Sequence, residues 1–287
     1  MKLSRGGIGI MAMIMIILLA SIFIVGGIFP KPSTTDPNAE KFTVITGIPL
    51  DSHNTLQLKT IKFNSCASTA AVDFLVDRSG SMRFGSKLDN VKGALKVFAD
   101  NFPNEGIIAM QTFSDFPSAD VPFDYFRNVK SQFINAVYSI YADGGTSTKD
   151  AFTFTKSKLD NAMPKFPNQK FSLIFISDGV PETLATNIAL CPGGNPDPTY
   201  CTYSPTTPGA CRCFDTNQDP TQVADEIKKS GVRIFTIGFI HDEDLKFQND
   251  LTELMKRVAS SPNDFYQAPI NNQLTDILQQ ISVKICN

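Results

Sequence analysis

The chain has 287 residues, enough for one substantial domain with additional segments. Hydrophobic residues make up 42% of it, which is ample for a packed core, and the composition predicts no long disordered stretch. The formal net charge of -2 provides no basic field that would attract nucleic acid, and no basic patch is interleaved with aromatic residues. We therefore expect a folded protein that does not bind nucleic acid.

The N-terminal segment is predicted to span a membrane. Residues 8–29 contain no charged side chain, and at about 1.5 Å per residue a helix of this length crosses the roughly 30 Å hydrocarbon core of a bilayer. Lys2 and Arg5 precede the run, so the N-terminus is expected in the cytoplasm and the rest of the chain outside it. The alternative is a cleaved signal peptide, whose apolar core is normally about 7–15 residues long and ends at small residues. A pilin-like leader is a third interpretation, but no acidic residue follows the basic region.

Six cysteines agree with export, because an even number suits disulfide formation in an oxidising compartment. Cys66 lies just before the first expected core strand and Cys286 is the penultimate residue, so a bridge between them would join the two ends of the domain. The other four lie close together, at Cys191, Cys201, Cys211 and Cys213. A structural zinc site usually presents two short pairs such as C-x2-C. This spacing differs from that pattern and favours two disulfides, whose pairing the sequence leaves open.

Segments of strand and helix character alternate along the chain. Residues 30–40 are typical of a linker, and residues 41–64 of a hairpin that leads into the domain. From residue 71 onward, short apolar runs indicate strands, and apolar residues at helical spacing indicate helices. The expected strands are 71–76, 107–113, 121–126, 171–176, 233–240 and 265–267, and the expected helices are 88–98, 129–141, 149–163, 223–230, 245–259 and 274–285.

This alternation predicts an α/β fold, a Rossmann-like doubly wound and mostly parallel sheet with helices on both faces. The domain is expected over residues 65–287, with a Cys- and Pro-rich insertion at 180–220. Ahead of it we expect residues 1–29 as membrane anchor or signal peptide and residues 30–64 as linker and hairpin. Ligands of such sheets bind outside the carboxyl ends of the strands. The residues that follow the strands are therefore the candidates for a functional site.

Side chains that carry oxygen follow two of these strands, and another lies in a turn between those strands in the sequence. Asp77, Ser79 and Ser81 come after the first strand, Asp178 follows a later one, and Thr146 lies in a Gly-rich turn. Two carboxylates and three hydroxyls make an all-oxygen site, which suits a hard cation such as Mg²⁺. Each residue alone is more often a helix cap or a turn residue. The prediction of a metal site depends on all five together.

These residues resemble the metal-ion-dependent adhesion site (MIDAS) of the von Willebrand factor type A family. The D-x-S-x-S motif of that family, its threonine and its second aspartate are matched in order by Asp77, Ser79, Ser81, Thr146 and Asp178. The resemblance covers about residues 66–286. It implies a Rossmann-like domain that binds protein ligands through Mg²⁺ or Mn²⁺, with Ca²⁺ as a further choice, often at a ligand Glu or Asp. In that family the hydroxyls contact the metal directly, and the aspartates act largely through water.

The sequence thus predicts a membrane-anchored adhesion protein whose domain lies outside the cytoplasm and uses the cation to bind an acidic residue of a protein partner. The insertion at 180–220 leaves from the loop of Asp178, so we expect it on the binding face, where it would shape partner specificity. A protective loop is the alternative for this segment. For the whole chain the alternative is a structural subunit of a surface filament, in which the N-terminal helix packs against its copies. The oligomeric state is left open.

Enzymatic alternatives lack the residues that they require. A phosphatase of the haloacid dehalogenase type needs a second aspartate two residues after the first, where this chain has Ser79. A Ser–His–Asp hydrolase needs a positioned histidine, but His53 lies in the expected hairpin and His241 in an acidic, solvated stretch, and no G-x-S-x-G motif occurs. There is no P-loop motif either. We therefore expect a binding protein and not an enzyme.

Overall fold

The computed structural model describes residues 69–185, 202–203, 211–240, 245–268 and 273–285. Within these ranges no helix is both long and apolar enough to cross a membrane. The expected membrane segment at 8–29 and the expected hairpin at 41–64 lie outside the described residues, as do His53, His241, Cys66, Cys191, Cys201 and Cys286.

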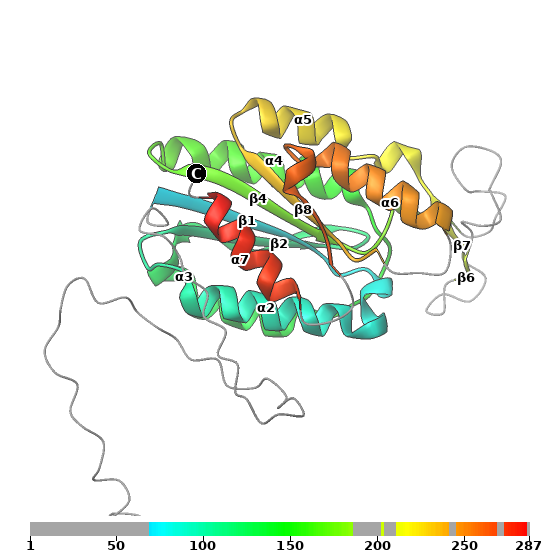
Figure 1. Ribbon diagram of the computed structural model, residues 1–287, viewed down its shortest axis with the longest axis horizontal. Helices are drawn as coiled ribbons and strands as arrows, with labels where there is room; N and C mark the ends of the chain where they lie inside the picture. Colours follow the sequence, from blue (N-terminus) through cyan, green and yellow to red (C-terminus); the bar gives the residue numbers. More distant parts are fainter. Residues whose placement is uncertain (1–68, 186–201, 204–210, 241–244, 269–272, 286–287) are drawn as a thin grey trace, which may run out of the picture. The chain divides into compact units, whose positions relative to one another are not determined.

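Six strands form one mostly parallel sheet, in the order β3-β2-β1-β4-β8-β9 (Figure 1). They are β1 (Ala70–Asp77), β2 (Ile107–Phe113), β3 (Pro117–Tyr125), β4 (Lys170–Ser177), β8 (Arg233–Gly238) and β9 (Phe265–Gln267). Within this sheet only the edge strand β3 runs antiparallel to its neighbour. β1 and β2 are buried at every position, as expected for parallel strands covered on both faces. The predicted Rossmann-like α/β fold is confirmed.

Helices cover both faces of this sheet and create two hydrophobic cores (Figure 1). On one face lie α2 (Lys87–Asn101), α3 (Phe126–Ser139) and α7 (Leu274–Ile285), and on the other α4 (Thr148–Ala162), α5 (Thr221–Lys229) and α6 (Leu245–Val258). Aromatic pairs lie in both cores: the ring centroids of Phe74 and Phe98 are 5.0 Å apart in the first, and those of Phe152 and Phe175 are 5.0 Å apart in the second. This packing holds the strand ends rigidly in place.

The boundaries around β3 differ from the prediction. The strand begins at Pro117 and not at residue 121, because pairing with β2 extends over polar residues that carry no apolar signal. Helix α3 begins at Phe126, which was assigned to the strand. Phe126 is fully buried and packs edge-on against Phe102 and Phe133, so it belongs to the helical side of the core.

Short elements complete the described part. The 3-10 helices are η2 (Gly80–Ser86), η3 (Met163–Lys165), η6 (Thr216–Gln218) and η7 (Pro262–Asp264). Three short segments of the insertion at 180–220 form an antiparallel sheet that was not predicted, with β5 (Glu182–Ala185) and β6 (Thr202–Tyr203) on either side of β7 (Cys211–Phe214). The insertion therefore leaves the domain and returns to it as paired strands, a few residues after Asp178.

Candidate metal site

The carboxyl end of β1 places Asp77 inside the protein. Its side chain is fully buried, and both of its oxygens accept hydrogen bonds. The Ser79 N–H donates to Oδ1 at 2.7 Å, which closes a tight turn after the strand. The Ser177 hydroxyl, at the end of the neighbouring strand β4, donates to Oδ2 at 2.5 Å. Two parallel strands thus orient one carboxylate at their common edge.

A second carboxylate joins this edge through the serine hydroxyls. Ser81 Oγ donates to Asp178 Oδ1 at 2.7 Å, and the hydroxyls of Ser79 and Ser81 lie 2.9 Å apart. Because Ser81 uses its single hydrogen on Asp178, the Ser79 hydroxyl is the donor within the serine pair. The candidates from the first and the later strand therefore form one network: Asp77, Ser79, Ser81 and Asp178.

Thr146 reaches the same edge on the loop between α3 and α4. It is 1% exposed, and a Cβ added to Gly179 would meet Thr146 Oγ1 at 3.4 Å, so the hydroxyl lies against the backbone just after Asp178. The loop is bound to the β1 end by two backbone hydrogen bonds, from Gly80 N–H to the Gly144 carbonyl at 3.0 Å and from Asp143 N–H to the Arg78 carbonyl at 2.8 Å. The structure therefore brings all five predicted residues together.

Asp115, which the sequence analysis missed, holds the Gly-rich loop in place. Its Oδ1 accepts a hydrogen bond from Gly145 N–H at 2.7 Å. Gly144 has a φ of +77°, and a Cβ added there would lie 2.5 Å from Asp115 Oδ2, so only glycine fits. Asp115 comes two residues after the strand 107–113, which is the position at which the other candidates were sought. That placement is the signal that could have identified it.

Lys87 is a second member of the site that the sequence analysis missed. Its Nζ donates to Asp178 Oδ2 at 2.6 Å, and the lysine is 7% exposed. Lys87 is the first residue of α2 and precedes Val91 and Leu95 at helical spacing, so it lies on the buried face of that helix. A lysine at the same helical spacing as apolar residues indicates a buried charge, which needs a partner. This pattern in the sequence could have identified Lys87.

The charges of the site favour the binding of a cation. Burial, and then the charge of nearby Asp178, raise the pKa of Asp77 from its usual 3.8 to about 7, although hydrogen bonds from Ser177 and Ser79 oppose the rise. A positive ion beside the carboxylates would reverse this effect. Within the described residues no three His, Cys, Asp or Glu side chains cluster around a common point. The donor set is two carboxylates with three hydroxyls, hard oxygen ligands of the kind that Mg²⁺ and Ca²⁺ prefer.

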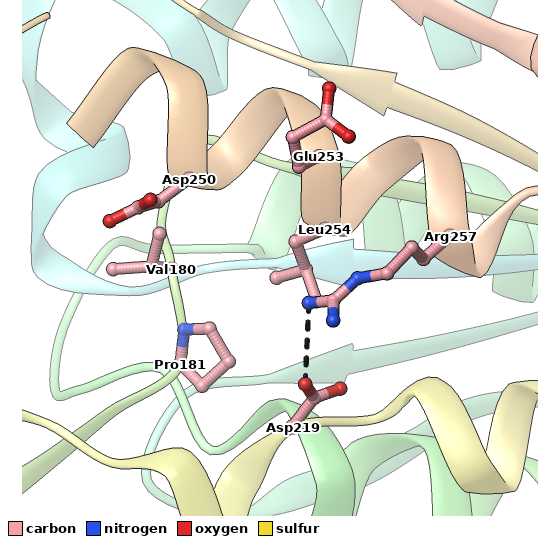
Figure 2. Close-up of a pocket in the computed structure, with 7 residues that line it drawn as sticks. All are labelled: Val180, Pro181, Asp219, Asp250, Glu253, Leu254 and Arg257. Atoms are coloured by element: carbon pink, nitrogen blue, oxygen red, sulfur yellow. Dashed lines mark hydrogen bonds and ion pairs between the residues drawn. The ribbon is translucent and has the colours of Figure 1, made fainter. Parts of the chain in front are cut away.

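A pocket of about 450 Å³ lies next to this site but contains none of the five candidates. Val180 and Pro181, which directly follow the Asp178 loop, form one side of it, and α6 forms another (Figure 2). Arg257 extends from α6 to Asp219, with its guanidinium 3.3 Å from the carboxylate. The pocket therefore adjoins the base of the insertion.

The family model of the von Willebrand factor type A domain matches residues 72–180, the stretch from the middle of β1 to just beyond Asp178. No curated protein matches the sequence. Solved structures that share the fold include the vWF domain of the type V pili tip protein Mfa5 from Porphyromonas gingivalis, at 16% identity and a TM-score of 0.57. That alignment covers 76% of this chain and 95% of the other.

Two further solved structures are similar over only part of their length. The pilus adhesin SpaC from Lactobacillus rhamnosus GG has 18% identity and a TM-score of 0.57, with 76% of this chain and 31% of SpaC covered. Proximal thread matrix protein 1 from the mussel byssus, with a zinc-occupied MIDAS motif, has 15% identity and a TM-score of 0.53. There 76% of this chain and 48% of the mussel protein are covered. At these identities the likeness concerns the fold.

Proposed function

We propose that this chain is an adhesion protein that binds its partner through a divalent cation, because residues 72–180 match the family model of the von Willebrand factor type A domain. The ion would be held by five side chains: Asp77, Ser79, Ser81, Thr146 and Asp178. Mg²⁺ fits the donor set best, with Mn²⁺ and Ca²⁺ as alternatives. When bound, the ion supplies a positive charge with free coordination positions, to which an exposed Asp or Glu of a protein ligand can bind.

One observation carries this proposal: four of the five candidates share one hydrogen-bonded network at the carboxyl edge of the sheet. Asp77 ends β1 and Asp178 directly follows β4, 101 positions later in the sequence, yet both side chains are buried at this edge. Two buried carboxylates repel each other and favour a cation between them. The zinc-occupied MIDAS motif of the similar mussel protein agrees with a divalent ion in a domain of this fold.

The residues of this chain have separate roles in the proposed binding. Ser79 and Ser81 present neutral hydroxyl oxygens, which leave more positive charge on the ion than carboxylates would. Asp77 is fixed by Ser177 and by the Ser79 backbone, so that it needs little rearrangement to meet the ion. We further propose that residues 8–29 anchor the chain with its domain outside the cell, where the insertion at 180–220 selects the partner.

A structural role in a surface filament is the second candidate. It is favoured by the similarity in fold to the Mfa5 pili tip domain and to the PilB minor pilin from Streptococcus sanguinis, which has 16% identity and a TM-score of 0.55. The two functions predict different behaviour in a chelator. An adhesin of the proposed kind releases its partner when the cation is removed, whereas a filament joined by packing of N-terminal helices stays assembled.

The test is calorimetric titration of Mg²⁺ into the full chain and into Asp77→Ala, with Asp89→Ala as a matched control on the exposed face of α2. We expect the Asp77 variant to lose on the order of a hundredfold or more in Mg²⁺ affinity and the control to lose none. Capture of surface proteins by the immobilised chain, in Mg²⁺ and then in chelator, reports on the partner. Capture that persists equally in chelator and in the Asp77 variant would contradict the proposal.

A further inference from the structure

A lysine ammonium already lies inside the candidate metal site. Lys87 Nζ is 2.6 Å from Asp178 Oδ2, and the side chains of Lys87 and Asp178 are 9% and 0% exposed. The other oxygen of the same carboxylate accepts the Ser81 hydroxyl at 2.7 Å. The chain itself thus occupies both oxygens of one of the two carboxylates that would serve a metal.

This pairing allows the site to form without an ion. A buried carboxylate is unfavourable unless it is paired and hydrogen-bonded, and Asp178 has both kinds of partner. A divalent ion that enters the site meets the ammonium as a like charge at short range, in surroundings where water screens little. The ion and Lys87 therefore compete for the charge of Asp178.

We propose that Lys87 is the resident cation of this site, which weakens its hold on the divalent ion and strengthens its attraction for an acidic ligand. Two carboxylates, the ammonium and a divalent ion together leave a surplus of one positive charge. Without the ammonium, the charges of the two carboxylates and the divalent ion sum to zero. This inference rests on the proposed function, because it describes how the same site balances metal against ligand.

The test uses Lys87→Met, which keeps an unbranched side chain of similar length, and Lys87→Gln, which keeps a hydrogen-bond donor. Lys96→Met is the matched control, because Lys96 is on the same helix and its side chain is 46% exposed, paired with Asp100. Calorimetry with Mg²⁺ alone on the full chain measures metal affinity. We expect both Lys87 variants to bind Mg²⁺ at least about tenfold more tightly than the natural chain, and the control to match it.

Thermal unfolding in chelator provides a readout that does not depend on metal. We expect Lys87→Met to unfold on the order of 5–10 °C below the natural chain, because Asp178 then lacks its counter-ion, and saturating Mg²⁺ to remove most of that difference. A lysine that only packs against the core would lower the unfolding temperature equally with and without Mg²⁺, and that result would overturn the inference.

The outcomes separate this inference from the proposed function. Equal Mg²⁺ affinity of the natural chain and both Lys87 variants, all folded by circular dichroism, would overturn the competition and leave metal-dependent adhesion intact. Mg²⁺ binding by the Lys87 variants alone would support Lys87 as resident cation and overturn a metal role in the natural chain. Absence of Mg²⁺ binding in every variant would overturn both.

Discussion

Replacing Asp73 by asparagine should stabilise the domain and flatten its dependence on pH. Asp73 lies in the middle of β1, between Ala109 of β2 and Leu173 of β4, and is fully buried. Neither of its oxygens hydrogen-bonds to another group of the described part of the chain, and the same holds for Gln111 Oε1. Burial raises the pKa of Asp73 well above its usual value, and the Gln111 side chain offsets this only in part.

The change in stability with pH follows from the different proton affinities of Asp73 in the folded and the unfolded chain. Above the usual pKa of 3.8 the unfolded chain releases the Asp73 proton, whereas the folded chain keeps it up to the raised pKa. The contribution of Asp73 to stability is therefore fully present below pH 3.8 and is lost as the pH rises from there toward the raised pKa. Asp77 adds a loss of the same sign up to about pH 7. Asp73→Asn removes the loss that Asp73 causes and leaves that of Asp77, so stability should fall less steeply with pH, at roughly half the slope of the natural chain.

Urea unfolding of the full chain in chelator at three pH values between 4.5 and 6 measures this slope. At the upper end we expect Asp73→Asn to exceed the natural chain by on the order of 1–3 kcal/mol, because asparagine stays neutral and the unfolded chain no longer gains free energy by ionising at this position. Asp89→Asn, the same change at an exposed carboxylate, should leave the slope unchanged. An unchanged slope in Asp73→Asn, or a lower stability at pH 6, would refute the reasoning.

Three other substitutions test the framework around the site. Gly144→Ala should weaken Mg²⁺ binding at least about tenfold in calorimetry, because the new Cβ collides with Asp115 at a positive φ; unchanged affinity would mean that the loop adapts. Gly93→Ala, in helix α2 with no atom within 4 Å of its new Cβ, should instead stabilise by about 0.5–1 kcal/mol in urea unfolding. Arg233→Ala should raise the lowered pKa of Asp264, whose burial is outweighed by hydrogen bonds and charge from its neighbours; the variant should be less stable than the natural chain at about pH 5 and should lose less stability as the pH falls to about 3 in thermal unfolding, because the ionised carboxylate then contributes less.

Much of the fold could be predicted from the sequence because its signals are local. The buried strands are continuous apolar runs, the helices have apolar residues at helical spacing, and both properties follow from neighbouring residues alone. The five candidate positions could be selected for a related reason: four of them follow strands directly, at the edge where parallel strands all end. The small sheet within the insertion carried no such pattern, and β3 begins in a polar stretch whose only support is its pairing with β2.

What the tertiary structure decided is which of these groups touch. Lys87 and Asp178 are 91 positions apart, and no local pattern reports that the start of α2 packs against the end of β4. The same holds for Asp115, whose contact with Gly145 connects loops 30 positions apart. The sequence therefore determined the fold class and the kinds of oxygen donor at the sheet edge, since both depend on residue type and spacing. The counter-ion of Asp178 depends on packing between distant segments, and only the folded chain reveals it.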